Sequence, residues 1–159
     1  MAGLVLTLAP YEKVLIGGVV VQNGQKRAAL RVEAGAAGVL RLSDAMHPDA
    51  ARTPLTRCYY AAQLLLLGEA GPGGEAVLAR LLSDAAAGFE GFAFSSPLAE
   101  AARAARARAW FRVMRRLRPL LPQEAALLAD PRFRAPSNVP ELPSVATIGG
   151  AGREALTAR

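Results

Sequence analysis

Few residues in this 159-residue sequence could do nucleophilic or acid–base chemistry. His47 is the sole histidine, which leaves almost nothing for a Ser-His-Asp triad or a histidine-rich metal site. Asp44, His47 and Asp49 could form a weak metal site, but without further ligands nearby we expect a polar turn. Cys58, the single cysteine, falls on the apolar face of a predicted helix and should be a buried structural residue.

The other candidates for catalysis are no stronger. The glycine clusters lack the lysine and the spacing of a phosphate-binding loop. Glu12 and Glu33 fit surface groups of strands or turns better than an acid–base pair. We therefore expect a binding protein that is no enzyme and uses no cofactor and no metal.

Positive charge is concentrated in one segment of the chain. The formal net charge is +6, and residues 98–121 alone carry seven arginines against Glu100, which is also a net +6. The charges of all other segments cancel. A local field of this kind can steer a polyanion toward the protein.

This basic segment predicts a single amphipathic helix that opens at Ser96–Pro97 and ends near Pro119. At 100° per residue the apolar side chains share one arc. The opposite arc holds the arginines, with Phe111 among them: Arg108, Arg112, Arg115, Arg116 and Arg118. Guanidinium groups bind phosphates and a ring can stack on a base, so this face suits single-stranded nucleic acid. Five phosphate contacts would give log affinity a slope of roughly −3.5 against log salt. A protein interface and a plainly solvated face are the alternatives.

The elements that precede this helix predict an α+β fold. Thr53–Pro54 opens a helix that Gly68 ends, a second helix runs from about Glu75 to Phe92, and Pro122 begins a short fourth one. Short β-prone runs occupy the N-terminal part: Gly3–Leu8, Lys13–Ile16, Val19–Gln22, Gln25–Val32 and Val39–Leu42.

Two turns should organise these strands. Asn23–Gly24 predicts a type I′ hairpin between the third and fourth strands, because both central positions of that turn need a positive φ. Gly17–Gly18 permits a bend or bulge.

The predicted organisation has three parts. Residues 1–48 form a five-stranded antiparallel β-module, residues 53–129 a bundle of three to four helices, and residues 130–159 a largely disordered tail rich in proline and glycine. No apolar run reaches the ~20 residues of a membrane helix, and the N-terminus does not resemble a signal peptide. We therefore expect a cytoplasmic protein that does not engage membranes.

Four segments, in order over about residues 1–129, resemble the FlbT family of alphaproteobacterial flagellar regulators. They are Gly3–Thr7, Glu12–Gly18, Thr53–Gln63 and Arg108–Glu124. The resemblance implies post-transcriptional repression of flagellin, by association with the 5′ untranslated region of flagellin mRNA and promotion of its decay. It also implies work alongside a partner, FlaF.

The first forty-odd residues also resemble the carbon storage regulator CsrA, a five-stranded RNA-binding protein that dimerises by interleaving strands. Leu8 and Ala9 stand where that family has two arginines after its opening strand, and Ser43 stands near the place of a third. The arginines that grip RNA in CsrA are thus not retained. If RNA is bound, we expect the arginines of the predicted amphipathic helix, together with Lys26, Arg27 and Arg41, to make the contacts.

The leading hypothesis is a repressor in flagellum biogenesis that binds the flagellin mRNA leader and promotes its degradation, as a homodimer through the β-module. The alternative is an adaptor that controls flagellin synthesis by docking FlaF or flagellin without direct RNA contact. A secretion chaperone for flagellin is a third possibility.

Overall fold

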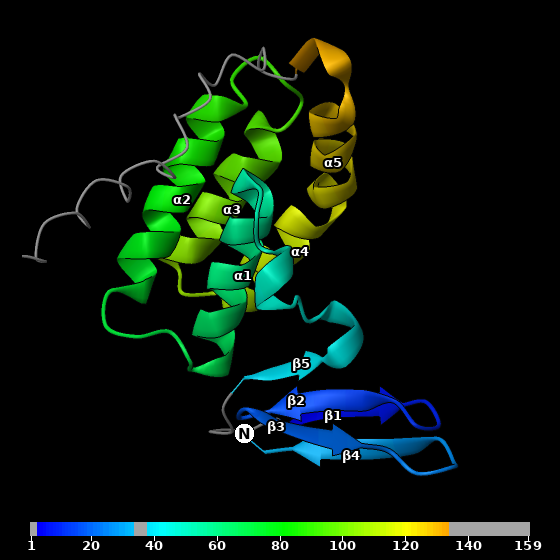
Figure 1. Cartoon of the computed structure of the whole chain (residues 1–159). Helices are drawn as coiled ribbons and strands as arrows, with labels where there is room; N and C mark the ends of the chain where they lie inside the picture. The colour runs from blue at the N-terminus through cyan, green and yellow to red at the C-terminus, as the bar shows by residue number, and fades with distance from the viewer. Residues whose placement is uncertain (1–2, 34–37, 134–159) are drawn as a thin grey trace, which may run out of the picture.

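The computed structural model describes residues 3–33 and 38–133 of the chain. Within these residues five strands come first and five α-helices follow, so the predicted mixed α+β class is confirmed. Figure 1 shows the strands gathered at one end of the molecule and the helices at the other, with β5 nearest the helices. The predicted tail lies, from residue 134 onward, outside the described residues.

The strands form two small antiparallel sheets. One pairs β1 with β4, and the other has the order β3-β2-β5. The strand bounds are Leu4–Leu8 (β1), Lys13–Ile16 (β2), Val19–Gln22 (β3), Ala28–Val32 (β4) and Val39–Arg41 (β5). The five predicted strands are present, but the single CsrA-like module is not confirmed.

The predicted hairpin at Asn23–Gly24 is wrong. β3 pairs with β2 and β4 pairs with β1, so the chain crosses between sheets at this point. Neither residue has a positive φ. Instead the side-chain Nδ2 of Asn23 donates to the carbonyl oxygens of Ala9 (2.7 Å) and Lys26 (2.9 Å), which ties the crossing to the end of β1.

The tight turn of the structure lies six residues earlier. Gly17 and Gly18 have φ values of 57° and 79°, and Ile16 pairs directly with Val19. Two consecutive positive φ angles are the signature of a type I′ turn, which glycine adopts without steric cost. The two glycines therefore close the β2–β3 hairpin and do more than permit a bend.

The first helix follows its predicted signals. Thr53 caps it in a reciprocal capping box with Thr56, and Gly68, at φ 74°, ends it. The helix bounds are Pro54–Leu67 (α1), Gly74–Gly88 (α2), Ser95–Arg106 (α3), Trp110–Leu117 (α4) and Leu121–Ala129 (α5). Short 3-10 turns also occur at Leu42–Asp44 (η1), Pro48–Ala50 (η2), Arg118–Leu120 (η3) and Pro131–Phe133 (η4).

The predicted single helix of the basic segment is also wrong. It is broken into α3 and α4 at Ala107–Ala109, where Arg108 takes the left-handed conformation with φ 54°. Because of the break, both helices bury apolar residues in the core: Ala101 and Ala104 of α3, and Val113 and other apolar residues of α4. Packing of two short helices thus prevails over the local preference for one long one.

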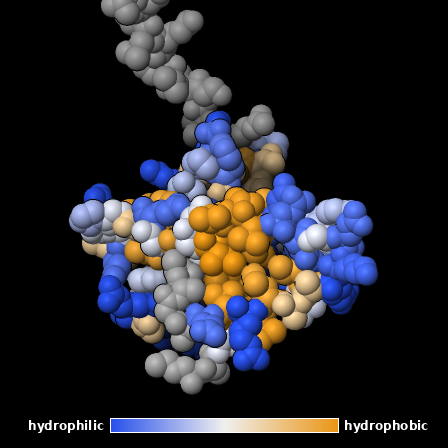
Figure 2. All heavy atoms as spheres, turned by 90° about the horizontal axis from the view of Figure 1, so that it is seen from below, coloured by the Kyte–Doolittle hydropathy of each residue, from blue (hydrophilic) through white to orange (hydrophobic). Residues whose placement is uncertain are grey.

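The core lies among the helices, and the strand end is largely uncovered. The buried cluster draws on α1 to α4, and Leu40 of β5 is its one strand member among the described residues. Gly38 fits β5 against α1, since a Cβ there would meet the carbonyl oxygen of Leu66. Seen from the strand end, the molecule shows a broad apolar patch (Figure 2).

Candidate nucleic-acid interface

Three of the five predicted arginines form ion pairs with acidic residues on other elements, and two of these three lie outside α4. Arg108 forms an ion pair with Glu75 at the start of α2. Arg118 of η3 forms an ion pair with Asp44 of η1, and thereby links the helices to the segment after β5. The arginines therefore do not form a single row.

The other three predicted arginines are all on α4, and two of them, Arg112 and Arg116, border a hollow between α3 and α4. Its volume is about 380 Å³, and its lining is Glu100, Arg103, Ala104, Ala107, Arg112 and Arg116. A smaller hollow of about 150 Å³ is lined by Arg112, Arg115 and Arg116. We call the surface formed by Arg103, Arg112, Arg115, Arg116 and Glu100 the basic groove.

Positive charge exceeds negative charge in the basic groove. Arg116 Nε lies 2.8 Å from Glu100 Oε2. Arg103, Arg112 and Arg115 are exposed, and none forms an ion pair within the described part of the chain. Three guanidinium groups are thus available to oxygen atoms of a ligand, and guanidinium forks fit phosphate oxygens well.

Packing holds the groove's arginines outward. Val113, Met114 and Leu117 are buried and fix α4 against the core, which leaves positions 112, 115 and 116 on the solvent side. On α3 the buried residues facing inward include Ala101 and Ala104, whose small side chains let the two helices approach closely.

Arg103 is the groove residue that sequence reasoning missed. A continuous helix places it on the apolar side, whereas the break at Ala107–Ala109 brings the end of α3 beside α4. No glycine, proline or capping side chain marks the break. The sequence therefore offers no local signal for it.

Phe111 is exposed to 47% on α4. It lies one helical turn from Arg115, the spacing at which helix side chains are neighbours. The predicted neighbourhood with Arg108 is lost, because Arg108 stands before the helix begins. An exposed ring beside a guanidinium group is still suited to stacking on a base.

The basic residues of the strand end lie apart from the groove. Arg41 pairs with Glu12 and donates to the carbonyl oxygen of Thr7 at 3.1 Å, so its guanidinium links the two sheets. Lys26 and Arg27 are exposed in the segment between β3 and β4. The structure thus brings together Arg112, Arg115 and Arg116 of the predicted set, and leaves the others at separate places.

The polar turn expected at His47 is confirmed. Nδ1 of His47 accepts a hydrogen bond from the Asp49 backbone N–H (3.3 Å) and caps η2, while the Asp44 carboxylate is held by Arg118. Within residues 3–33 and 38–133, no group of three or more His, Cys, Asp or Glu could hold a metal ion.

Cys58 is buried, as predicted. Burial, followed by the negative charges of Glu124 and Asp84, raises the pKa of its thiol to about 12. The thiol therefore stays protonated at neutral pH and is a poor nucleophile.

Glu124 is a buried carboxylate that sequence reasoning did not single out. It is 1% exposed, and it accepts hydrogen bonds from Thr53 Oγ1 (2.5 Å) and from the backbone N–H of Leu55 (2.9 Å). The first turn of α1 contains no acidic residue of its own. A helix N-terminus favours negative charge. Glu124 of α5, far away in the sequence, therefore supplies the carboxylate that the first turn of α1 lacks.

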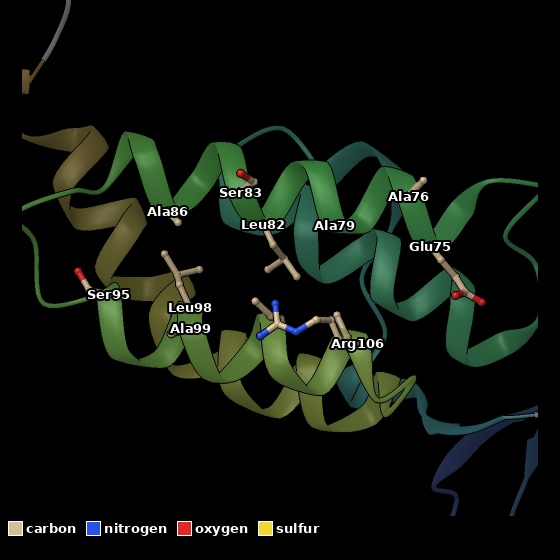
Figure 3. Close-up of a pocket in the computed structure, with 12 residues that line it drawn as sticks. Glu75, Ala76, Ala79, Leu82, Ser83, Ala86, Ser95, Leu98, Ala99 and Arg106 are labelled. Carbon is tan, nitrogen blue, oxygen red and sulfur yellow. The ribbon is translucent and has the colours of Figure 1, made fainter.

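A third hollow, of about 610 Å³, lies between α2 and α3 (Figure 3). Leu82 and Leu98 point toward each other from the two helices, and most of the remaining lining is alanine. The side chain of Arg106 reaches into this space. We call this the alanine groove.

No helix among the described residues combines the length and the apolar character that crossing a bilayer requires.

Comparison with known proteins gives one family. The family model described as "Flagellar protein FlbT" matches residues 4–128, which include every strand and nearly all of the helical part. A flagellum biosynthesis repressor protein FlbT from Caulobacter vibrioides is 41% identical over 68 residues, which is 43% of this chain and 48% of that protein.

Two further relatives give the same picture. A probable flagellum biosynthesis repressor protein FlbT from Caulobacter sp. (strain K31) is 43% identical over 67 residues, 42% of this chain and 50% of the relative. A probable flagellum biosynthesis repressor protein from Bradyrhizobium diazoefficiens is 33% identical over 64 residues, which is 40% of this chain and 44% of the relative. The chain spans about half the length of the curated relatives it matches. No solved structure matches.

Proposed function

We propose, from the premise that this chain belongs to the FlbT family of flagellar proteins, that it represses flagellin synthesis after transcription, during flagellum biogenesis in the cytoplasm. In this proposal it is not an enzyme. It binds the 5′ untranslated region of flagellin mRNA through the basic groove and promotes degradation of that mRNA. The printed names of the relatives, flagellum biosynthesis repressors, support the general role.

The basic groove carries the RNA part of the proposal. Arg103, Arg112 and Arg115 have no carboxylate partner within the described residues, and each lines at least one of the two hollows of the basic groove. A phosphodiester backbone offers oxygens at intervals that several guanidinium groups can meet at once. Phe111 adds a ring on which an unpaired base can stack.

Removal of the unpaired arginines tests this assignment. We expect Arg112→Ala/Arg115→Ala to bind a labelled flagellin leader RNA at least about tenfold more weakly than the wild type, because two charge-assisted contacts are lost. Fluorescence polarisation titration at fixed salt measures the affinity, and circular dichroism checks the fold.

A matched control removes the same charge elsewhere. Arg57 of α1 and Arg80 of α2 are exposed and line neither hollow of the basic groove. Arg57→Ala/Arg80→Ala should keep most of the affinity. Equal loss in both double variants would mean that net charge alone attracts RNA and that the groove is not the site.

The adaptor function is the second candidate, and the alanine groove favours it. Small side chains on α2 and α3 leave room for a helix of another protein, and Arg106 could meet an acidic side chain of that helix. FlaF or flagellin would be the docked protein, without RNA contact. Ala79→Trp and Ala102→Trp, which fill this groove, should then abolish repression in cells while leaving RNA affinity unchanged.

A further inference from the structure

The end of the molecule formed by β1 to β5, here called the strand end, buries fewer residues than a sheet with one covered face. A sheet with one covered face buries roughly every second residue. Of the 21 residues in β1 to β5, three are buried: Leu8, Val14 and Leu40. Two- and three-stranded sheets are marginal by themselves, so another surface should complete them.

The uncovered residues are of the kind that proteins normally bury. All four residues of β3 are exposed, and three of them are valine; Val19 is exposed to 63%. Leu4 and Val5 of β1 are about half exposed as well. Figure 2 shows the resulting apolar patch at the strand end. Contiguous apolar patches on a protein surface commonly mark interfaces.

The unpaired edges of the strands also indicate an interface. β3 pairs on one side with β2, and β1 pairs on one side with β4, so each has a second edge without a strand partner among the described residues. Natural edge strands are usually protected by a charge, a proline or a bulge. β1 and β3 contain no charged residue and no proline.

We propose that a second copy of this chain covers the strand end, in a two-fold symmetric dimer whose interface includes β1 and β3. Two copies, each with a net charge of +6, repel unless they meet through an uncharged surface. β1 and β3 provide that surface, with free backbone donors and acceptors that an identical edge can pair. The strands of this end contribute 18 residues that are not buried, which approaches the ~20–30 residues a side of a standard interface.

The proposal is independent of RNA binding, and its test contains no RNA. Sedimentation equilibrium of the full chain, over a wide range of protein concentrations, measures the mass and the dimer dissociation constant. We expect a particle of twice the 16.6 kDa chain mass. Val20→Lys should raise the dissociation constant at least tenfold, because it places a charge on β3 within the interface.

The chain offers a matched control for this substitution. Val77 of α2 is exposed to 55% and Val20 to 52%, so Val77→Lys makes the same chemical change at the helical end. It should leave the dissociation constant unchanged. A wild type that is monomeric throughout would overturn the proposal, since the face would then be covered by another part of the chain or by a foreign protein. Equal effects of the two substitutions would overturn it as well.

Discussion

Single side chains decide whether the basic groove can accept an anion. Glu100 stands within the groove and neutralises Arg116. In contrast, the ion pair between Glu12 and Arg41 has a structural role. It links the two sheets, and the Arg41 guanidinium has few donors left for a ligand. Charge type alone, which is all that the sequence offers, cannot separate these two uses.

Replacing Glu100 should strengthen RNA binding. In Glu100→Gln the Arg116 guanidinium is released and a carboxylate that repels phosphate is removed, so we expect an affinity gain of about three- to tenfold. Stability should change by less than ~1 kcal/mol, since exposed ion pairs contribute little. Polarisation titration with leader RNA measures the gain, and an unchanged or weaker affinity would speak against binding in the groove.

Acid should weaken the contact at Glu12. The backbone N–H of Ala9 and then the Arg41 guanidinium stabilise the ionised carboxylate, and they lower its pKa below the ordinary 4.5. Ionised Glu12 therefore adds stability above that value, and the contribution is lost as pH falls through the lowered pKa. We expect Glu12→Gln to lower Tm at pH 7, by an amount that shrinks toward zero at acid pH. A difference that stays constant down to pH 3 would contradict this origin.

The helix-capping signals predict α1 correctly, whereas features set by long-range packing could not be predicted from local sequence. The Thr53 cap and the Gly68 stop lie where the sequence indicates. Asn23–Gly24 has the residue types that a type I′ hairpin prefers, yet the long-range pairing of β1 with β4 overrides this local preference. The break between α3 and α4 has no sequence marker, so neither the break nor the place of Arg103 in the groove could be predicted.

The break can be tested by comparing glycine with alanine at residue 108. Arg108 has a positive φ, a conformation that costs an L-residue other than glycine roughly 1–2 kcal/mol. Arg108→Gly should therefore be more stable than Arg108→Ala by about 1 kcal/mol. In an unbroken helix the order reverses, because alanine exceeds glycine by ~1 kcal/mol there.

Chemical denaturation of both variants measures the difference, and both lose the ion pair with Glu75 equally. The same pair of substitutions at Arg103, inside α3, serves as the control. There alanine should be the more stable.

At the scale of the whole molecule, contacts between distant segments hold the two ends and the last helix in place. The Arg118–Asp44 pair and the hydrogen bond from Tyr59 to the Asp44 carbonyl (2.7 Å) connect helices to the segment after β5. Glu124 connects α5 to the start of α1. The sequence predicts the order of the elements but not these partners, which lie up to 74 residues apart.

Loss of the Glu124 contact should destabilise the molecule. Glu124→Ala leaves the Thr53 hydroxyl and the Leu55 N–H without their acceptor and opens space in the core, so we expect a loss of about 2–4 kcal/mol. Urea denaturation measures it. Glu90→Ala, at an exposed glutamate, should cost less than ~0.5 kcal/mol. Similar small losses in both variants would contradict the capping role of Glu124.

The salt dependence of RNA affinity tests the central claim most directly. With three unpaired arginines in the basic groove, log affinity should fall with log salt at a slope of about −2, in place of the −3.5 of a five-arginine row. Arg112→Ala/Arg115→Ala should reduce the slope to about −0.7. A slope near zero, or one that the double substitution leaves unchanged, would contradict RNA binding in the groove.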